Sequence, residues 1–290
     1  MELKYKNSNS NYKKVLDVLK LEFSMSDRLI LKLKKSMKIY LNGNVSYVWT
    51  PISIGDIICV LIDFDEDNSN IVPAHINLDI LYEDDALLIV NKPSSMPVHP
   101  SNLHYSDSLS NGVKYYFDSI GLNKKIRPIN RLDKDTTGIV LFAKNEYIQE
   151  CLVKQMKSKT FVKEYIAVLD GILSENKGTI CAPITRKENS IIERVVSESG
   201  DTAITHFEVL KTLSNISLVK FTLETGRTHQ IRVHSKYIGH PIIGDTLYGT
   251  PSPLISRQAL HAYKVSFIHP ITKKQISITT DLPKDILSLF

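Results

Sequence analysis

The chain has 290 residues, 42% of them hydrophobic, which is enough for one large domain or for a large domain with a small companion. Lys and Arg total 36 against 31 Asp and Glu, so the net charge is +5 at pH 7, a mild excess that fits a polyanionic partner but does not establish one. The wide spacing of Cys59, Cys151 and Cys181 argues against a disulfide framework and a zinc site, and no apolar run approaches the roughly 20 residues of a membrane helix, so we expect a globular protein of the reducing cytoplasm.

A polar start and a compact unit come first along the chain. Residues 1–12 are rich in Asn and Ser, and we expect them to be loosely ordered. In residues 13–62, apolar side chains at near-helical spacing predict two short helices, the second of which is capped by Ser26. An Asn-Gly turn between two β-rich stretches then predicts a hairpin, and GDIICVLI predicts a third strand.

The second of these helices carries a basic face. Arg28, Lys32 and Lys35 recur at i, i+4 and i+7, opposite the apolar stripe. A face of this kind is most often plainly solvated. The order of two helices and a hairpin, however, resembles the small RNA-binding module shared by a ribosomal small-subunit protein and many RNA-modifying enzymes. This resemblance makes the three cations candidate RNA contacts.

An acidic stretch without apolar periodicity, residues 63–76, indicates a linker and leaves residues 77–290 as the larger domain. There ILYEDDALLIVNKP predicts two strands around an Asp-Asp turn, and further β-rich stretches follow to the end of the chain. SDSLSNGVKYYFDSI and YIQECLVKQMKSK predict helices. Together these elements indicate an α+β fold, in which a mixed, mostly antiparallel sheet with flanking helices is preceded by a small α/β module.

Asp133 lies in the motif NRLDKDTTG, directly before the apolar run of residues 139–143, which predicts a buried strand. Loops at the mouth of a core strand commonly hold reactive groups. The plainer interpretation is that Asp133 and Asp135 only make turn hydrogen bonds through their carboxylates, as Asp often does. The spacing alone favours this plainer interpretation.

The motif GRTHQIRVH permits either a strand or a helix. In both cases Arg232 lies close to a buried element, and a buried arginine needs a carboxylate or a phosphate. A salt bridge to Asp133 would meet that need. His229 and His234 are spaced i, i+5, which suits neither a helix face nor a strand face, and no third ligand is nearby, so we do not expect a metal site.

Tyr165 in KEYIAV follows an alternating strand pattern, for which a core tyrosine is the default interpretation. The chain lacks glycine-rich loops of the Walker or dinucleotide-binding kind. Nucleoside triphosphates and nicotinamide cofactors are therefore unsupported.

Six stretches are more informative together than any one of them alone. In chain order they are NKPSSMPVHP, NRLDKDTTGIVLFAK, KEYIAV, GRTHQIRVH, GDTLYG and LHAYKVSFIHP. In order and spacing they closely resemble the RluA/RluD-type pseudouridine synthases, from about residue 79 to residue 270. The resemblance implies an isomerase acting on uridine in RNA: the bond from N1 to C1′ breaks, the uracil turns, and C5 is joined to the sugar.

The resemblance also implies roles for individual residues. Asp133 corresponds to the family's catalytic aspartate, Tyr165 to the tyrosine that stacks on the target base, and Arg232 to the arginine that pairs with the aspartate. Arg131 corresponds to the arginine that enters the RNA stack when the base is flipped out, and Leu260 to a leucine that lines the base pocket. A guanidinium beside Asp133 would keep its carboxylate ionised in a site that excludes water.

Arg227 and His229 lie in the same motif as Arg232, and we expect them to contact RNA. No cofactor is implied, because the reaction exchanges one bond for another without net redox change or hydrolysis. One position departs from the family pattern, since members usually have His before the RLD motif and this chain has Asn130. That position flanks the carboxylate without supplying the reactive oxygen, so we expect activity to survive, with an altered rate or substrate choice left open.

The leading hypothesis is an RNA pseudouridine synthase that acts as a monomer, with large-subunit ribosomal RNA favoured over transfer RNA. The alternative is a non-catalytic RNA-binding or ribosome-assembly protein on the same scaffold, but pure binding needs no buried carboxylate. A hydrolase that uses Asp133 and Asp135 as a pair is weaker, because carboxylates at i and i+2 in a turn do not reliably face one bond.

Overall fold

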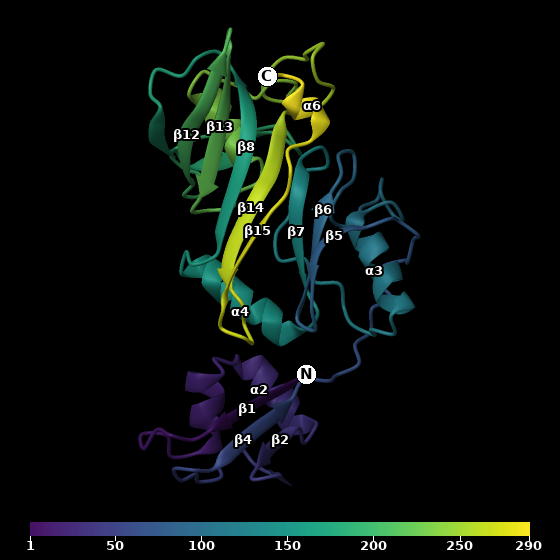
Figure 1. The fold of residues 1–290 in the computed structure, drawn as a ribbon, viewed down its shortest axis with the longest axis vertical. Helices are drawn as coiled ribbons and strands as arrows, with labels where there is room; N and C mark the ends of the chain where they lie inside the picture. Colours follow the sequence, from purple (N-terminus) through teal and green to yellow (C-terminus); the bar gives the residue numbers. More distant parts are fainter.

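The computed structural model describes all 290 residues, which form two main sheets joined by an extended segment, together with a small two-stranded ribbon (Figure 1). The first 62 residues, here called the N-terminal unit, form an antiparallel sheet of order β1-β4-β2-β3. Its strands are β1 (Glu2–Lys6), β2 (Ile39–Leu41), β3 (Asn44–Val45) and β4 (Ile57–Leu61). Its helical segments are α1 (Val15–Asp17), the π-helical turn η1 (Val18–Glu22) and α2 (Asp27–Lys35). The expected helices and hairpin are present, and the Ser26 hydroxyl accepts a hydrogen bond from the Leu29 N–H at 3.2 Å, as a helix cap does.

The start of the chain differs from the expectation of loose order for residues 1–12. Glu2–Lys6 forms β1, which pairs along its whole length with β4. Leu3 is buried in the core beneath the sheet, and the Met1 amino group lies near the end of β4. A strand of five residues with one buried side chain gains most of its stability from backbone pairing. With only one buried side chain, the sequence of this strand shows too little apolar alternation to predict β1.

The remainder of the chain forms the larger sheet, of order β5-β6-β7-β14-β8-β13-β12-β9, with β15 also paired to β14. Its strands are β5 (Asp79–Glu83), β6 (Leu87–Lys92), β7 (Thr137–Ala143), β8 (Val162–Asp170), β9 (Lys177–Cys181), β12 (Ile204–Leu213), β13 (Ile216–Leu223), β14 (Leu260–Ile268) and β15 (Gln275–Thr279). β10 (Ile184–Arg186) and β11 (Arg194–Val196) make a separate two-stranded ribbon. Only the β7–β14 pair is parallel, so the expected mixed, mostly antiparallel sheet is confirmed.

Helices cover both faces of the sheet at β6 and β7. These helices are α3 (Leu109–Ser119) and α4 (Glu146–Lys157), and α5 (Gln230–Tyr237) and α6 (Lys284–Leu287) follow later in the chain. Successive strand residues face opposite sides, so Val140 and Phe142 pack with α3 while Ile139 and Leu141 pack with α4. All seven residues of β7 are therefore buried, as its apolar run predicts. No helix combines the length and apolar composition that a membrane span requires.

The parallel β7–β14 pair is short and close. Gly138 has φ +110°, and a Cβ atom at this position would lie 2.3 Å from the carbonyl oxygen of Ala262. Only glycine permits both this backbone conformation and this approach. The turn before β7 lies at Lys134 and Asp135, where the Thr136 N–H donates to the Asp133 carbonyl at 3.1 Å. The segment 133–137 is thus held against the start of β14.

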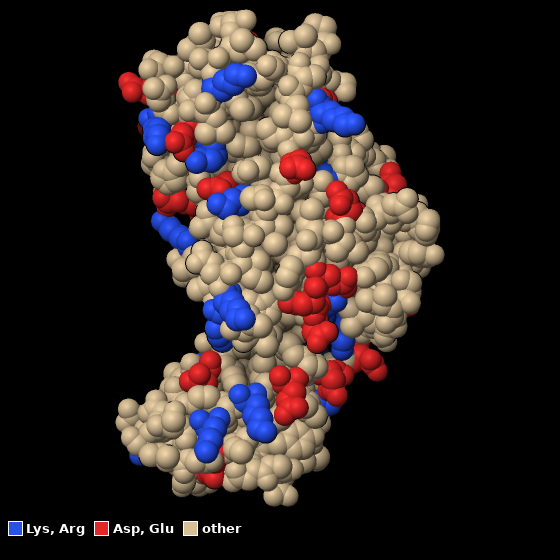
Figure 2. Space-filling view, in the orientation of Figure 1, with Lys and Arg blue, Asp and Glu red and all other residues tan.

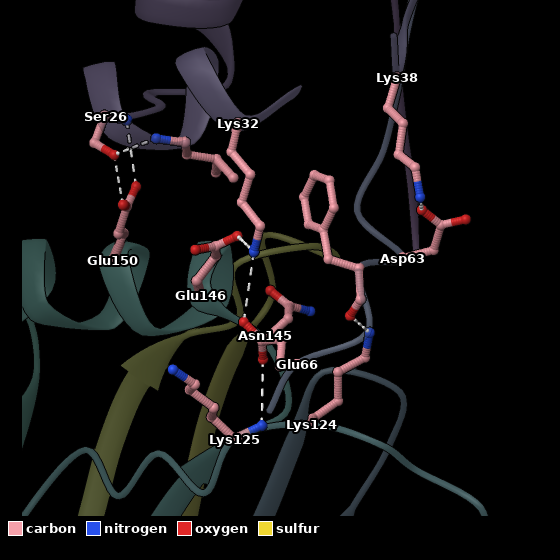
Figure 3. Close-up of polar contacts among 12 residues, drawn as sticks. Ser26, Lys32, Lys38, Asp63, Glu66, Lys124, Lys125, Asn145, Glu146 and Glu150 are labelled. Carbon is pink, nitrogen blue, oxygen red and sulfur yellow. Dashed lines mark hydrogen bonds and ion pairs between the residues drawn. The ribbon is translucent and has the colours of Figure 1, made fainter. Parts of the chain in front are cut away.

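The N-terminal unit lies against α4 through apolar and polar contacts, here called the junction (Figure 3). One continuous buried cluster includes side chains of α2, β4, β6, β7 and α4. Ser26 donates through its hydroxyl to Glu150, and Lys32 forms an ion pair with Glu146 at 2.6 Å. Lys32 also lies 3.6 Å from a Glu66 oxygen. In Figure 2, acidic side chains gather where the smaller lower part meets the larger upper part.

The junction divides the basic face expected on α2. Arg28 and Lys35 are exposed, whereas Lys32 is half-buried and neutralised by Glu146 and Glu66. The ammonium group of Lys32 also lies 4.1 Å from the centre of the Phe64 ring, a cation–π contact. The charge of Lys32 is therefore used within the protein, which makes Arg28 and Lys35 the better candidates for RNA contacts on this face.

We predict that Lys32 and Glu146 are energetically coupled. Lys32→Met and Glu146→Gln should each lower the free energy of unfolding, and the double variant should be less destabilised than the sum by about 0.5–1 kcal/mol, because each single change leaves a partner uncompensated. Urea unfolding of the four proteins measures this coupling. Lys35→Met on the same helix is the matched control and should change stability by less than about 0.5 kcal/mol. Strictly additive effects would show that the ion pair contributes nothing.

Candidate functional site

A cleft of about 1030 Å³ opens between the loop before β7, strand β8 and the loop before α5. Its lining includes five residues singled out from the sequence: Arg131, Asp133, Tyr165, Arg227 and His229. A small hollow of about 70 Å³ adjoins it and adds Arg232 and Leu260 to the same surroundings. The structure therefore brings together seven predicted side chains from four separate motifs. Arg28, Lys32 and Lys35 lie in the N-terminal unit, outside this cleft.

Arg232 is the hub of the polar contacts in the cleft. Its Nη1 donates to Asp133 Oδ2 at 3.0 Å, which is the salt bridge expected from the sequence. Its Nε and Nη2 donate to the two oxygens of Asp245 at 2.7 and 2.8 Å. This second contact is the bidentate fork that a planar guanidinium makes with a carboxylate. Burial acts against the charge of Arg232, but its hydrogen bonds to Asp245 and the charge of Asp133 raise its pKa, so it stays a cation.

Asp245 was not predicted from the sequence. It comes from the GDTLYG motif, is fully buried, and also accepts hydrogen bonds from the N–H groups of Leu247 and Tyr248 at 3.0 and 3.1 Å. The sequence held one indication that Arg232 needs a second partner. A buried guanidinium has five donors, which one carboxylate cannot satisfy. Asp245 holds Arg232 in place, and Arg232 in turn holds Asp133.

The Asp133 carboxylate has one occupied oxygen and one available oxygen. Oδ2 accepts from Arg232, while Oδ1 accepts no hydrogen bond from the protein, its nearest imidazole nitrogen being His229 Nε2 at 3.7 Å. The side chain is 24% exposed, so Oδ1 can reach a molecule in the cleft. An oriented carboxylate of this kind can act as a nucleophile or as a base.

His229 lies at the beginning of α5, which settles the open choice between strand and helix in favour of a helix. It adopts the left-handed conformation with φ 58°, and its Nδ1 lies 2.8 Å from the Tyr248 hydroxyl. Burial lowers the pKa of His229, although the Asp133 charge acts in the opposite direction. The imidazole is therefore neutral at pH 7 and can donate or accept a hydrogen bond toward the cleft.

Tyr165 stands on β8 and belongs both to the core and to the cleft. It is 7% exposed and packs in the same apolar cluster as Leu260, which is 4% exposed. Burial, with a contribution from the charge of Asp133, raises the pKa of Tyr165, so its phenol stays protonated at neutral pH. Its ring presents an apolar and aromatic surface to a molecule that approaches Asp133.

Two polar side chains fix the loop that carries Asp133. Asn130 donates to the Ile139 carbonyl and accepts from the Leu141 N–H, both at 2.9 Å, so it ties the loop to β7. Lys92 is fully buried and donates to three backbone carbonyls, including that of Lys134 at 2.8 Å. Lys92 was not predicted, although a lysine directly before proline at the end of an apolar strand was a visible signal. Burial lowers the pKa of Lys92 to about 7, while the three carbonyls match the three donors of its ammonium form.

Arg131 and Arg227 lie at the mouth of the cleft, where both are exposed. Arg227 donates to the Thr202 carbonyl at 3.0 Å and to Asp201 at 3.3 Å. No salt bridge restrains Arg131, whose side chain is free to reach toward a bound molecule.

Comparison with known proteins bears on what this cleft does. Residues 86–237 match the family described as RNA pseudouridylate synthase. The chain is 43% identical over 233 residues to an uncharacterized RNA pseudouridine synthase of Bacillus subtilis, YhcT, covering 79% of this chain and 77% of that protein. It is 38% identical over 239 residues to the ribosomal large subunit pseudouridine synthase D of Blochmanniella floridana, covering 77% and 74% of the two chains.

A solved structure shares the fold. The human RNA pseudouridylate synthase domain containing 1 superposes with a TM-score of 0.59 and 26% sequence identity. The alignment covers 72% of this chain and 84% of the human chain. The larger sheet is therefore arranged as in a protein of that family.

We predict that Asp245 is required for stability because it neutralises a buried cation. Asp245→Asn should lower the free energy of unfolding by about 3 kcal/mol, since the Arg232 charge would lose its buried counterion. Asp201→Asn, which removes the exposed partner of Arg227, is the matched control and should cost less than about 1 kcal/mol. Thermal or urea unfolding measures both, and equal costs for the two variants would contradict the role assigned to Asp245.

Proposed function

This chain belongs to the RNA pseudouridine synthase family, and we propose that Asp133 is the carboxylate with which it isomerises uridine. The observation that carries the proposal is the state of that carboxylate. One oxygen is occupied by Arg232, the other faces the cleft without a protein donor, and Tyr165 lines the same cleft. A binding protein on this scaffold would have no use for a carboxylate held in this way, and its negative charge would repel RNA.

The reaction conserves all atoms of the nucleotide. The N1–C1′ bond breaks, the freed uracil rotates, and a C5–C1′ bond forms while the proton on C5 leaves and N1 gains one. Oδ1 of Asp133 is placed to act on the sugar, either by attack at C1′ or by removal of a sugar proton. The cation of Arg232 keeps the carboxylate ionised and oriented throughout.

The remaining residues of the cleft position the base. Tyr165 stacks on the uracil, and Leu260 beside it gives the pocket an apolar wall. A uridine in a stem or compact loop must leave its stack to reach Asp133, at a cost of roughly a few kcal/mol. Arg131, exposed at the mouth of the cleft, stacks in the vacated space, and Arg227 and His229 contact the RNA nearby.

The target we propose is a uridine of large-subunit ribosomal RNA, with transfer RNA as the second choice. The similarity to the ribosomal large subunit pseudouridine synthase D of Blochmanniella floridana supports the first. We propose that residues 13–62, together with β1, form an RNA-binding module, that residues 63–76 are a linker, and that residues 77–290 form the catalytic domain. Arg28 and Lys35 would then supply the module's exposed cations. The free cysteines fit an enzyme that acts, as a monomer, in the reducing cytoplasm.

We predict that Asp133→Asn abolishes pseudouridine formation while RNA binding persists. The loss of rate should be roughly 1000-fold or more, because the amide is neither a nucleophile nor a base at neutral pH. Chemical adduct formation followed by reverse transcription of ribosomal RNA measures the product. Asp135→Asn, two residues away in the same turn, is the matched control and should retain activity. Full turnover by the Asp133 variant would refute the assignment.

A second prediction separates the cations of α2. Arg28→Gln and Lys35→Gln should each weaken RNA binding and lower the slope of log affinity against log salt by about one, because each removes one phosphate contact. Lys32→Gln should leave that slope unchanged, since its charge is already neutralised by Glu146. Unchanged slopes for Arg28→Gln and Lys35→Gln would mean that this face is merely solvated.

A further inference from the structure

The two-stranded ribbon β10–β11 places two like charges opposite each other. Arg186 on β10 is the register partner of Arg194 on β11. Like charges directly opposite in a strand pair are destabilising. No Asp or Glu lies within the 4.0 Å of a salt bridge to either guanidinium, so the protein itself does not offset the repulsion. An arrangement of this kind is suited to an anion from outside.

A hollow of about 470 Å³ lies next to these arginines. Arg186, Arg194 and Arg227 line it, together with neutral groups that include Thr185, Ser199 and Thr228. Its single carboxylate, Asp201, is already paired with Arg227 at 3.3 Å. The balance of charge in the hollow is therefore positive.

The hollow shares a wall with the catalytic cleft. Arg194, Arg227, Gly226 and Thr228 line both spaces. The Arg194 N–H also donates to the Tyr248 hydroxyl at 2.8 Å, and that hydroxyl lies 2.8 Å from His229 Nδ1. The ribbon is thus fastened to the side chains that surround Asp133.

The Arg194 side chain itself lacks a partner. Its Nη1 is buried and has no hydrogen-bond acceptor in the protein. A buried donor without an acceptor costs free energy, so such a group is expected to meet a water, an ion or a ligand. Arg194 and Arg186 both line the hollow, and two guanidiniums on one wall can share the oxygens of one phosphate group.

We propose that this hollow binds a backbone phosphodiester of the RNA, adjacent to the nucleotide whose uracil enters the cleft. The proposal rests on the proposed function. It assigns Arg186 and Arg194, neither of which was singled out from the sequence, to a phosphate site that fixes the register of the RNA without reading its bases. A phosphodiester of a bound strand is favoured over free phosphate, because the hollow adjoins the cleft that the strand must occupy.

The first test measures RNA binding with proteins that also carry Asp133→Asn, so that turnover does not interfere. Arg186→Gln and Arg194→Gln should each weaken affinity about tenfold at moderate salt, and the double variant should lower the salt slope by about one, because the two arginines share one phosphate. Lys274→Gln, which removes an exposed charge from the β14–β15 turn, is the matched control and should change neither quantity. Unchanged affinity and slope in the arginine variants would overturn the proposal.

The melting temperature without RNA separates binding from a structural role. Relief of the Arg186–Arg194 repulsion should leave the melting temperature of Arg186→Gln equal to that of the parent, or raise it. A lower melting temperature together with weaker binding would mean that Arg186 acts by supporting the fold, and would overturn the proposal.

The second test locates the phosphate. A set of RNAs carries a neutral methylphosphonate at one phosphodiester at a time, on either side of the target uridine. At one position the modification should weaken binding to the parent protein but should not further weaken binding to the arginine variants. The absence of such a position, with inorganic phosphate still raising the parent's melting temperature more than that of the variants, would identify a free-phosphate site instead. Pseudouridine formation by the unaltered enzyme is assayed alongside, because its absence would refute the proposed function rather than this site.

Discussion

The site depends on one buried guanidinium that has two carboxylate partners of different kinds. Asp245 is fully buried and takes two of the donors of Arg232, whereas Asp133 is partly exposed and takes one. The first contact supplies the counterion that makes burial of the cation possible, and the second turns that fixed cation toward the cleft. Because the three groups together carry one negative charge, the site presents an anion at a single defined oxygen. Tyr165, His229 and Leu260 line the space beside that oxygen.

The sheet brings these partners together from distant parts of the chain. Asp133 precedes β7, Leu260 begins β14, and the two strands are the only parallel pair, so Asp133 and Leu260 lie at the same end of the sheet. The approach of β7 to β14 requires Gly138, where any side chain would overlap the Ala262 carbonyl. Asn130 and Lys92 then fasten the loop from the other side. Asn130 therefore serves the backbone of β7, which explains how this position can differ from the family's usual His without touching the reactive oxygen.

Much of this was readable from the sequence, and the remainder was hidden for physical reasons. The buried strand β7, the helix α4 and the Arg232–Asp133 pair follow from apolar periodicity and from the needs of a buried cation. β1 was missed because backbone pairing with β4, which lies more than 50 residues away, stabilises it more than its own side chains do. The ion pair of Lys32 was not predicted because its partner Glu146 is remote in sequence, and helical spacing cannot show a neighbour from another element. Asp245 and Arg194 depend in the same way on contacts between distant loops.

The continuous core at the junction has a consequence for the binding of large RNA substrates. Because α2 and β4 share one buried core with β7 and α4, the N-terminal unit is packed against the larger domain and does not move on a flexible linker. The distance from Arg28 to the cleft is therefore fixed by packing. A longer segment in place of residues 63–76 would not increase this distance. If the N-terminal unit binds RNA as proposed above, an RNA that touches both ends would have to match a set distance in its own folded shape. Substrate selection would then depend on three-dimensional form as well as on the nucleotides around the uridine.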